Sequence, residues 1–240
     1  MGILSWEKNE SIAVIRMTSG ENKINQVFVD AMVRILDEIA ADNGLSSVMI
    51  VSGDGKFWST GLDVQWAAGL VRANDMAGVK KFMLAVNDMF KKILLFPMPV
   101  IAAINGHAFG AGAILSCVCD FRFMKADRGY FCFPEIDIGI PYLPSEIAFI
   151  TRFVPYRLFQ EMVLSGKRYG AADLERHGVI ERACADEADL MERAAAFAKS
   201  YNKKRGIFGE MKRRLNARII EIMDNEDARY VNSGTLLILD

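Results

Sequence analysis

The sequence lacks the features of membrane-spanning and nucleic-acid-binding proteins. Its 29 basic and 30 acidic residues leave a formal charge of −1, so no overall field attracts it to nucleic acid or anionic lipid. The longest apolar run, residues 93–104, is interrupted by Pro97 and Pro99 and is shorter than the ~20 residues of a transmembrane helix. The basic clusters at residues 203–206 and 212–214 are interpreted as solvated helix faces, although an anionic ligand tail could use one. We therefore expect neither a membrane nor a nucleic-acid partner.

The four cysteines do not have the spacing of a metal site. Cys117 and Cys119 form a lone C-x-C with no second pair and no nearby histidines. Three of the four cysteines lie in apolar runs, which favours buried thiols in a reducing compartment over disulfides. The chain shows neither a basic leader followed by an apolar block nor a C-terminal peroxisomal address. These features predict a cytoplasmic protein without a bound metal.

Hydrophobic periodicity predicts an α/β fold in a single domain, with a core over residues 1–185 and a helical region over 186–240. No linker, low-complexity segment or clear internal repeat divides the chain. The expected strands cover residues 11–18, 46–53, 99–104, 119–125 and 129–133. The expected helices cover residues 27–41, 75–96 and 110–118, and the chain is mainly helical from about residue 144.

Two glycine-rich loops, at residues 53–63 and 105–113, each follow a buried strand and precede a helix. Bare backbone at a helix start offers N–H donors that no side chain blocks. If two such donors converge on one oxygen they form an oxyanion hole, in which each is worth about 3–4 kcal/mol of barrier. The alternative is that the glycines only allow close packing of helix and strand. Neither loop matches the common phosphate-binding glycine motifs.

Glu135 lies in the apolar segment FPEIDIGIP, residues 133–141. A carboxyl group in such surroundings has a raised pKa, which suits proton transfer near neutral pH. The alternative is an exposed turn residue that shares the polar face of a strand with Asp137. Local sequence leaves both interpretations open.

Six segments of the chain form an ordered set of motifs. They are NKIN (22–25), KFWSTGLDV (56–64), PVIAAINGHAFGAG (99–112), CDFRF (119–123), FPEIDIGI (133–140) and LSGKRYGAADLERHGVIERA (164–183). Together they resemble the crotonase family, also called the enoyl-CoA hydratase/isomerase superfamily. The similarity extends from the first strands to about residue 185, and several motifs in register are more specific than any single one.

This resemblance implies a crotonase-like spiral of ββα turns, followed by a C-terminal helical region that mediates trimerisation. The homotrimers of the family commonly pair into dimers of trimers. Its substrates are acyl-CoA thioesters, with coenzyme A as part of the substrate and no other cofactor. The family's oxyanion donors correspond to the backbone N–H groups of Leu62 and Ala111. The substrate-binding positions that the resemblance implies are Lys23, Ile24, Thr60, Gly61, Asp63, Gly110, Tyr142 and Leu143.

The sequence departs from the hydratase pattern at one acid. Hydratases carry a glutamate at the position of Ile114, whereas the second family carboxylate is retained as Glu135. Leu143 stands where dienoyl-CoA isomerases and aromatic thioester dehalogenases place an aspartate. A single base suits a double-bond shift better than water addition, and the pattern is most similar to monofunctional Δ3,Δ2-enoyl-CoA isomerases. We therefore expect Glu135 to move a proton from C2 to C4 of a 3-enoyl-CoA.

Several alternatives stay open at this stage. The chain could be another lyase, hydratase or hydrolase of the family acting on an unusual acyl-CoA, or an acyl-CoA-binding subunit without turnover. Glu146 could enter the pocket, and His107 either acts on substrate or fixes the oxyanion loop by donating a hydrogen bond from its N–H. Asp120 is expected to be structural and Asp63 to cap a helix. Five apolar or aromatic residues could either line the acyl pocket or belong to the ordinary core: Trp66, Phe82, Met83, Tyr142 and Leu143.

Overall fold

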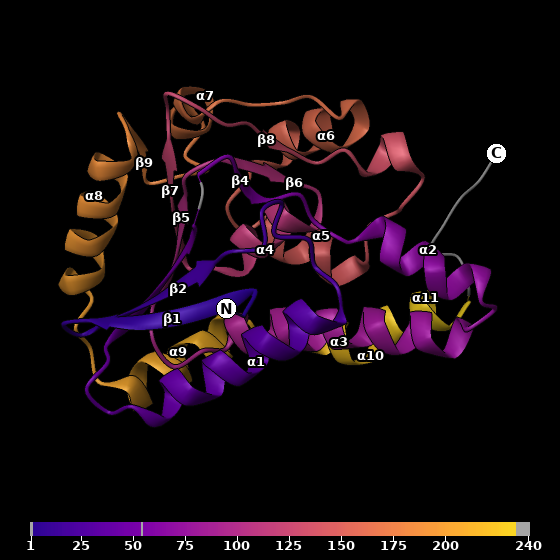
Figure 1. Cartoon of the computed structure of the whole chain (residues 1–240), viewed down its shortest axis with the longest axis horizontal. Coiled ribbons are helices and arrows are strands. Elements are labelled where there is room, and N and C mark those ends of the chain that lie inside the picture. The colour runs from indigo at the N-terminus through magenta and orange to yellow at the C-terminus, as the bar shows by residue number, and fades with distance from the viewer. Residues whose placement is uncertain (1, 54, 234–240) are drawn as a thin grey trace.

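A six-stranded sheet forms the centre of the molecule in the computed structural model, which describes residues 2–53 and 55–233 (Figure 1). The strand order is β1-β2-β3-β5-β7-β9, with β1 antiparallel to β2 and every other pair parallel. The strands are β1 (Leu4–Asn9), β2 (Ile12–Met17), β3 (Ser47–Ser52), β5 (Val100–Ile104), β7 (Phe121–Lys125) and β9 (Arg182–Cys184).

A second, smaller parallel sheet has the order β4-β6-β8. Each of its strands follows a strand of the large sheet and precedes a helix, so the chain winds through three ββα turns. The small strands are β4 (Phe57–Ser59), β6 (His107–Phe109) and β8 (Phe131–Cys132), and the helical segments after them are α2 (Val64–Arg72), α4 (Ala111–Val118) and the 3₁₀ turn η1 (Glu135–Ile138). This spiral is the fold that the resemblance implies.

The central sheet is buried on both faces because its strands alternate between two apolar layers. On one face Ile15 and Ile50 join the main core with α1 (Gln26–Ala41) and α3 (Met76–Leu94). On the other face Val14 and Val51 pack against α8 (Glu187–Ser200). Figure 1 shows α8 on the side of the sheet away from α1 and α3. A helix from the predicted C-terminal region therefore completes the core of the first 185 residues.

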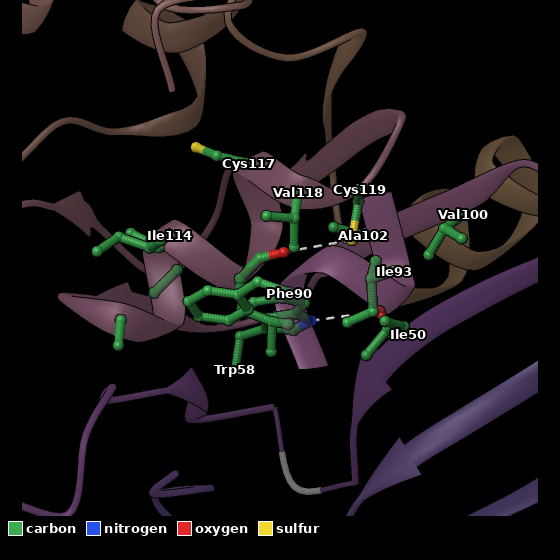
Figure 2. Close-up of a cluster of buried hydrophobic side chains, with 14 of the residues drawn as sticks. Ile50, Trp58, Phe90, Ile93, Val100, Ala102, Ile114, Cys117, Val118 and Cys119 are labelled. Atoms are coloured by element: carbon green, nitrogen blue, oxygen red, sulfur yellow. Dashed lines mark hydrogen bonds between the residues drawn. The ribbon is translucent and has the colours of Figure 1, made fainter. Parts of the chain in front are cut away.

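The main core fills the space between the large sheet and the small one. Trp58, at the centre of β4, is fully buried, and its indole N–H donates to the carbonyl oxygen of Ile50 at 3.2 Å (Figure 2). Phe90 of α3 and Ile114 of α4 belong to the same cluster. This contact ties β4 to β3 within the first ββα turn, which helps to fix the loop after β4.

Seven helices follow the ββα turns in the described part of the chain, which ends at residue 233. Asn25 and Asp75 cap the earlier helices α1 and α3 by accepting hydrogen bonds from backbone N–H groups. In Figure 1, α9 and α10 run along α1 and α3, and α10 packs on α5. These helices are α5 (Pro144–Ile150), α6 (Tyr156–Ser165), α7 (Ala171–Arg176), α8, α9 (Arg205–Leu215), α10 (Ala217–Asn225) and α11 (Asp227–Ser233). No helix in residues 2–53 or 55–233 is long and apolar enough to cross a bilayer.

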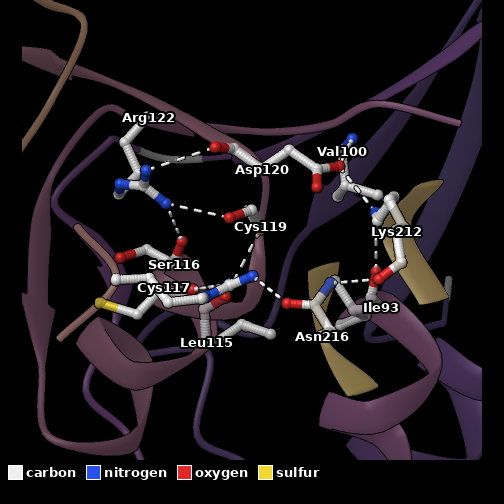
Figure 3. Close-up of polar contacts among 11 residues, drawn as sticks. Ile93, Val100, Leu115, Ser116, Cys117, Cys119, Asp120, Arg122, Lys212 and Asn216 are labelled. Carbon is white, nitrogen blue, oxygen red and sulfur yellow. Dashed lines mark hydrogen bonds and ion pairs between the residues drawn. The ribbon is translucent and has the colours of Figure 1, made fainter. Parts of the chain in front are cut away.

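A buried polar cluster joins α9 to the sheet (Figure 3). The carboxylate of Asp120 accepts from the N–H of Val100 at 2.8 Å and from Nζ of Lys212 at 2.7 Å. Asp120 is therefore structural, as the sequence predicted. A solvated helix face was the simplest interpretation of the basic run 212–214, but it is wrong for Lys212, which is 4% exposed. Burial lowers the pKa of Lys212, against the opposing effect of Asp120.

The short strands are the main elements that periodicity did not predict. β4 and β6 have three residues each and fall in segments interpreted as loops, and β9 lies in a region expected to be mainly helical. A strand of two or three residues is too short to display alternation. The internal repeat was not recognised for the same reason, because one of the two strands in each ββα turn is this short.

Candidate active site

The loop after β4 and the turn between β6 and α4 approach each other through bare backbone. Gly61 has φ +89°, and a methyl group on it would lie 2.7 Å from the Ala111 nitrogen and 2.8 Å from the Phe109 oxygen. A methyl group on Gly112 would lie 2.4 Å from the carbonyl oxygen of Ser59. Only glycine fits these two positions without moving backbone. The close packing of helix and strand, which the sequence analysis gave as one role of these glycines, is therefore present.

Leu62 and Ala111, one from each loop, carry unpaired N–H groups. Leu62 forms a parallel bridge with Ile24, in which the N–H of Ile24 donates to Gly61 and the N–H of Asp63 donates back to Ile24. Because N–H groups alternate along an extended chain, the Leu62 N–H points away from Ile24. Ala111 is the first residue of α4, where an N–H has no intrahelical partner. Neither N–H has a hydrogen-bond acceptor in the part of the chain that the structure describes.

Both residues line one cavity of about 70 Å³ between the two loops, η1 and α5. Its walls are mostly apolar, and the polar side chains that reach it are Thr60, Glu135 and Glu146. The other lining residues are Val64, Met83, Gly110, Ile114, Pro134, Ile138, Ile140, Pro141 and Leu143. A small apolar cavity with a few polar groups is typical of a ligand site.

Glu135 begins η1 and is only 6% exposed. The Tyr142 hydroxyl donates to its Oε2, and a methyl group on Gly110 would lie 3.2 Å from its Oε1. Burial raises the pKa of Glu135 to about 7, although the Tyr142 hydrogen bond opposes this shift. The interpretation of Glu135 as an exposed residue on the polar face of a strand is wrong. The carboxyl group instead lies in the cavity, beside the glycine that precedes Ala111.

The predicted substrate-binding residues fall into two groups. Thr60, Gly110 and Leu143 line the cavity, and Tyr142 reaches it through Glu135. Gly61 is not a lining residue, but it packs against the turn that carries Ala111.

The second group lies at a neighbouring surface groove, where Lys23 and Asp63 are found. Lys23 pairs with Glu21 at 2.7 Å, and Ile24 takes part through its backbone only, since its side chain is fully buried. Asp63 caps α2 by accepting from the N–H of Trp66 at 3.1 Å, as predicted. The Ile24–Leu62 bridge connects this groove to the cavity.

His107 is a structural residue of the small sheet. Its Nδ1 accepts from the N–H of Tyr130 at 3.2 Å, and its ring packs against Phe57 and Phe109. The expectation that it fixes the loop by donating is corrected in one respect, because the ring accepts the bond. His107 does not line the cavity, and burial lowers its pKa.

Trp66 and Phe82 pack edge to face with their ring centroids 4.7 Å apart, and neither lines the cavity. Met83 does line it. The sequence missed Ile138, Ile140 and Pro141, which reach the cavity from the turn after Glu135. The available signal was their position between Glu135 and Leu143, in a segment that contains both glycine and proline.

Glu146 lies in the cavity wall, a position that the sequence left open. It is half-buried, and its Oε2 accepts from the N–H of Leu143 at 2.8 Å. Burial raises the pKa of Glu146 to about 8, against the effect of the Leu143 hydrogen bond. The cavity therefore contains two carboxyl groups, of which the family pattern accounted for one.

The family model for enoyl-CoA hydratase/isomerase matches residues 7–235. The chain belongs to this family. It is 29% identical over 206 residues to enoyl-CoA delta isomerase 3 of Arabidopsis thaliana, covering 83% of this chain and 84% of the relative. It is 31% identical over 190 residues to carnitinyl-CoA dehydratase of Escherichia coli, covering 79% and 70% of the two chains. The crystal structure of an enoyl-CoA hydratase/isomerase family protein from Pseudomonas syringae has the same fold, with a TM-score of 0.86, 18% identity, and coverage of 96% and 97%.

The approach of the two loops predicts the effect of a single methyl group. Gly112→Ala forces backbone apart at Ser59 and should lower the free energy of unfolding by about 1–3 kcal/mol. Gly69→Ala is the matched control, because its methyl group meets no atom within 4 Å in α2 and should raise that free energy by about 0.5–1 kcal/mol. Urea unfolding measures both, and equal effects of the two substitutions would contradict the packing described.

Proposed function

We propose that this family member is an enoyl-CoA isomerase that converts 3-enoyl-CoA to trans-2-enoyl-CoA. The observation that carries the proposal is the single cavity shared by Glu135, the Leu62 amide and the Ala111 amide. The similarity to a plant enoyl-CoA delta isomerase supports it. Ile114 and Leu143 contribute apolar wall where other activities of the family place an acid.

Glu135 is the proposed base. Its carboxylate takes the C2 proton, and the C–H electron pair delocalises into the thioester as a dienolate. The N–H groups of Leu62 and Ala111 stabilise the dienolate oxygen, each by about 3–4 kcal/mol. Protonated Glu135 then returns its proton to C4, so that the double bond moves from C3–C4 to C2–C3. A pKa of about 7 suits both steps, because the group can take a proton and release it at neutral pH.

Tyr142 is the proposed positioning residue for this base. Its hydroxyl donates to Oε2 of Glu135 and leaves Oε1 on the side of Gly110 and the Ala111 turn. The hydrogen bond favours the ionised carboxylate, which is the reactive form. Burial and the neighbouring carboxyl group raise the pKa of Tyr142, so it stays a hydrogen-bond donor.

Water addition to 2-enoyl-CoA, or the reverse elimination, is the second candidate activity. Glu146 favours it, because two carboxyl groups in one cavity could handle water and a proton separately. Ile114 argues against it, since the position from which hydratases supply their other acid is apolar here. We therefore place isomerisation first.

We also propose that the protein forms a homotrimer, or a dimer of trimers, and works in the cytoplasm. The four free thiols fit a reducing compartment. In the helical region, Ile207, Met211 and Leu215 are 59%, 51% and 76% exposed and lie four residues apart on one side of α9. An exposed apolar stripe of this kind favours association with another chain.

Removing the base should abolish the double-bond shift. We expect Glu135→Gln to lower the rate of 3-hexenoyl-CoA isomerisation by roughly 10²–10⁴-fold, because the amide cannot take the C2 proton. The exposed Glu192→Gln is the matched control and should retain full activity. Ultraviolet absorbance of the conjugated thioester measures the rate. Equal rates for wild type and Glu135→Gln would remove Glu135 from the mechanism, and faster hydration than isomerisation would favour the second candidate.

The pH profile tests the role of Tyr142. The base must be ionised, so kcat/KM should rise with pH and reach half of its maximum near pH 7. Tyr142→Phe removes a bond that lowers the pKa of Glu135, and the half-maximum should move upward by roughly one pH unit. Tyr156→Phe, on an exposed side chain, should leave the profile in place. A midpoint unchanged or lowered in Tyr142→Phe would refute this role.

Sedimentation velocity tests the proposed assembly. The mass of the sedimenting species should be three or six times the 26.8 kDa mass of the chain. If α9 contributes to the interface, Met211→Glu should shift the distribution toward monomer, whereas the exposed Lys203→Glu should not. A wild-type protein that stays monomeric at micromolar concentration would rule the assembly out.

A further inference from the structure

The cavity contains a carboxyl group that the proposed isomerisation leaves unused. Glu146 is the third residue of α5, and its side chain enters the wall that also contains Leu143 and Pro141. Among the described residues, the other polar side chains on the lining are those of Glu135 and Thr60. A polar group on a mostly apolar lining is the kind of feature that orients a ligand and determines specificity.

The two oxygens of Glu146 have different surroundings. Oε2 accepts from the N–H of Leu143 at 2.8 Å, the contact by which a glutamate at this position commonly stabilises a helix start. Oε1 has no hydrogen-bond partner within residues 2–53 and 55–233. Capping therefore accounts for one oxygen only, and the other is available to the cavity.

The protonation state of Glu146 determines what Oε1 offers. Burial and the charges of Glu135 and Asp227 disfavour the anion, and the pKa of about 8 leaves the group mainly protonated at pH 7. Because Oε2 already accepts an amide hydrogen bond, the proton belongs on Oε1. Glu146 thus presents an O–H donor toward the cavity.

We propose that Glu146 selects acyl-CoA thioesters whose acyl chain carries a hydrogen-bond-accepting oxygen. This inference rests on the proposed function in taking an acyl-CoA as the ligand. A plain hydrocarbon chain would cover the Oε1–H and leave it unpaired, which is unfavourable in an apolar environment. A carbonyl or hydroxyl oxygen on the chain would accept the bond. Sites built around such a bond discriminate against analogues that lack it.

Binding of saturated thioesters tests this preference without turnover. The probes are hexanoyl-CoA, 4-oxohexanoyl-CoA, 5-oxohexanoyl-CoA and 6-hydroxyhexanoyl-CoA, with Kd measured calorimetrically at pH 7. We expect one oxygenated probe to bind about tenfold more tightly than hexanoyl-CoA. The two probes with oxygen at the other positions should gain less affinity, because Glu146 has a fixed position in the cavity wall.

Two variants separate ligand selection from helix capping. Glu146→Leu removes both the cap and the donor, and the preference for the oxygenated probe should disappear. Glu146→Gln can still accept from Leu143 and donates an N–H in place of the O–H, so most of the preference should remain. A residue that only capped α5 would weaken all four probes equally when lost and leave their ratios unchanged.

The outcomes distinguish this inference from the proposed isomerase activity. Equal Kd values for the four probes in wild type, or unchanged ratios in Glu146→Leu, would overturn the role of Glu146 even if 3-hexenoyl-CoA is isomerised. A clear preference together with no isomerisation of 3-hexenoyl-CoA would overturn the isomerase proposal alone. If none of the thioesters binds, both proposals fail.

Discussion

The close approach of two backbone segments is the constraint on which the site depends. Gly61 rests against the Ala111 turn, and Gly112 rests against Ser59, in both cases with no room for a methyl group. This contact follows from the parallel pairing of β4 with β6, which brings the ends of both strands to one edge. It determines where the Leu62 and Ala111 amides lie relative to each other, whereas the pairing of β6 with β8 brings Gly110 beside the Glu135 carboxyl group. The positions of the functional groups in the cavity therefore depend on main-chain contacts.

The pKa values of the two carboxyl groups in the cavity depend on the residues that line it. The lining residues include no lysine, arginine or histidine, so nothing but hydrogen bonds offsets the burial of the two carboxyl groups. Their pKa values rise to about 7 for Glu135 and about 8 for Glu146. The two groups differ in their hydrogen-bond partners, since the Tyr142 hydroxyl donates to Glu135 and the Leu143 amide donates to Glu146. The cations of the buried cluster, such as Lys212, are paired elsewhere.

Sequence patterns predicted the long elements and the two loops, but not how the loops are held. α1, α3 and the strands of the large sheet are long enough for their periodicity to show. β4 and β6 are not, although their pairing is what joins the loops. Glu135 looked like a strand residue because I-D-I alternates, whereas Pro134 and Gly139 enclose a 3₁₀ turn that buries it. The position of Glu146 depends on the packing of α5, which is a tertiary contact and leaves no local pattern.

The C-terminal helix α11 affects the same cavity because it is hydrogen-bonded to the start of α5. The N–H of Ser145 donates to Oδ1 of Asp227 at 3.1 Å, and Nδ2 of Asn87 donates to Oδ2 at 3.0 Å. Asp227 begins α11 and is fully buried, so the start of α5 is fixed between α11 and α3. Glu146 is the next residue after Ser145, and its place in the cavity wall depends on that anchor. α11, from the predicted C-terminal helical region, thus helps to position the Glu146 carboxyl group. Substitutions far from the cavity in sequence can therefore move Glu146, while the two glycine contacts keep the Leu62 and Ala111 amides in place.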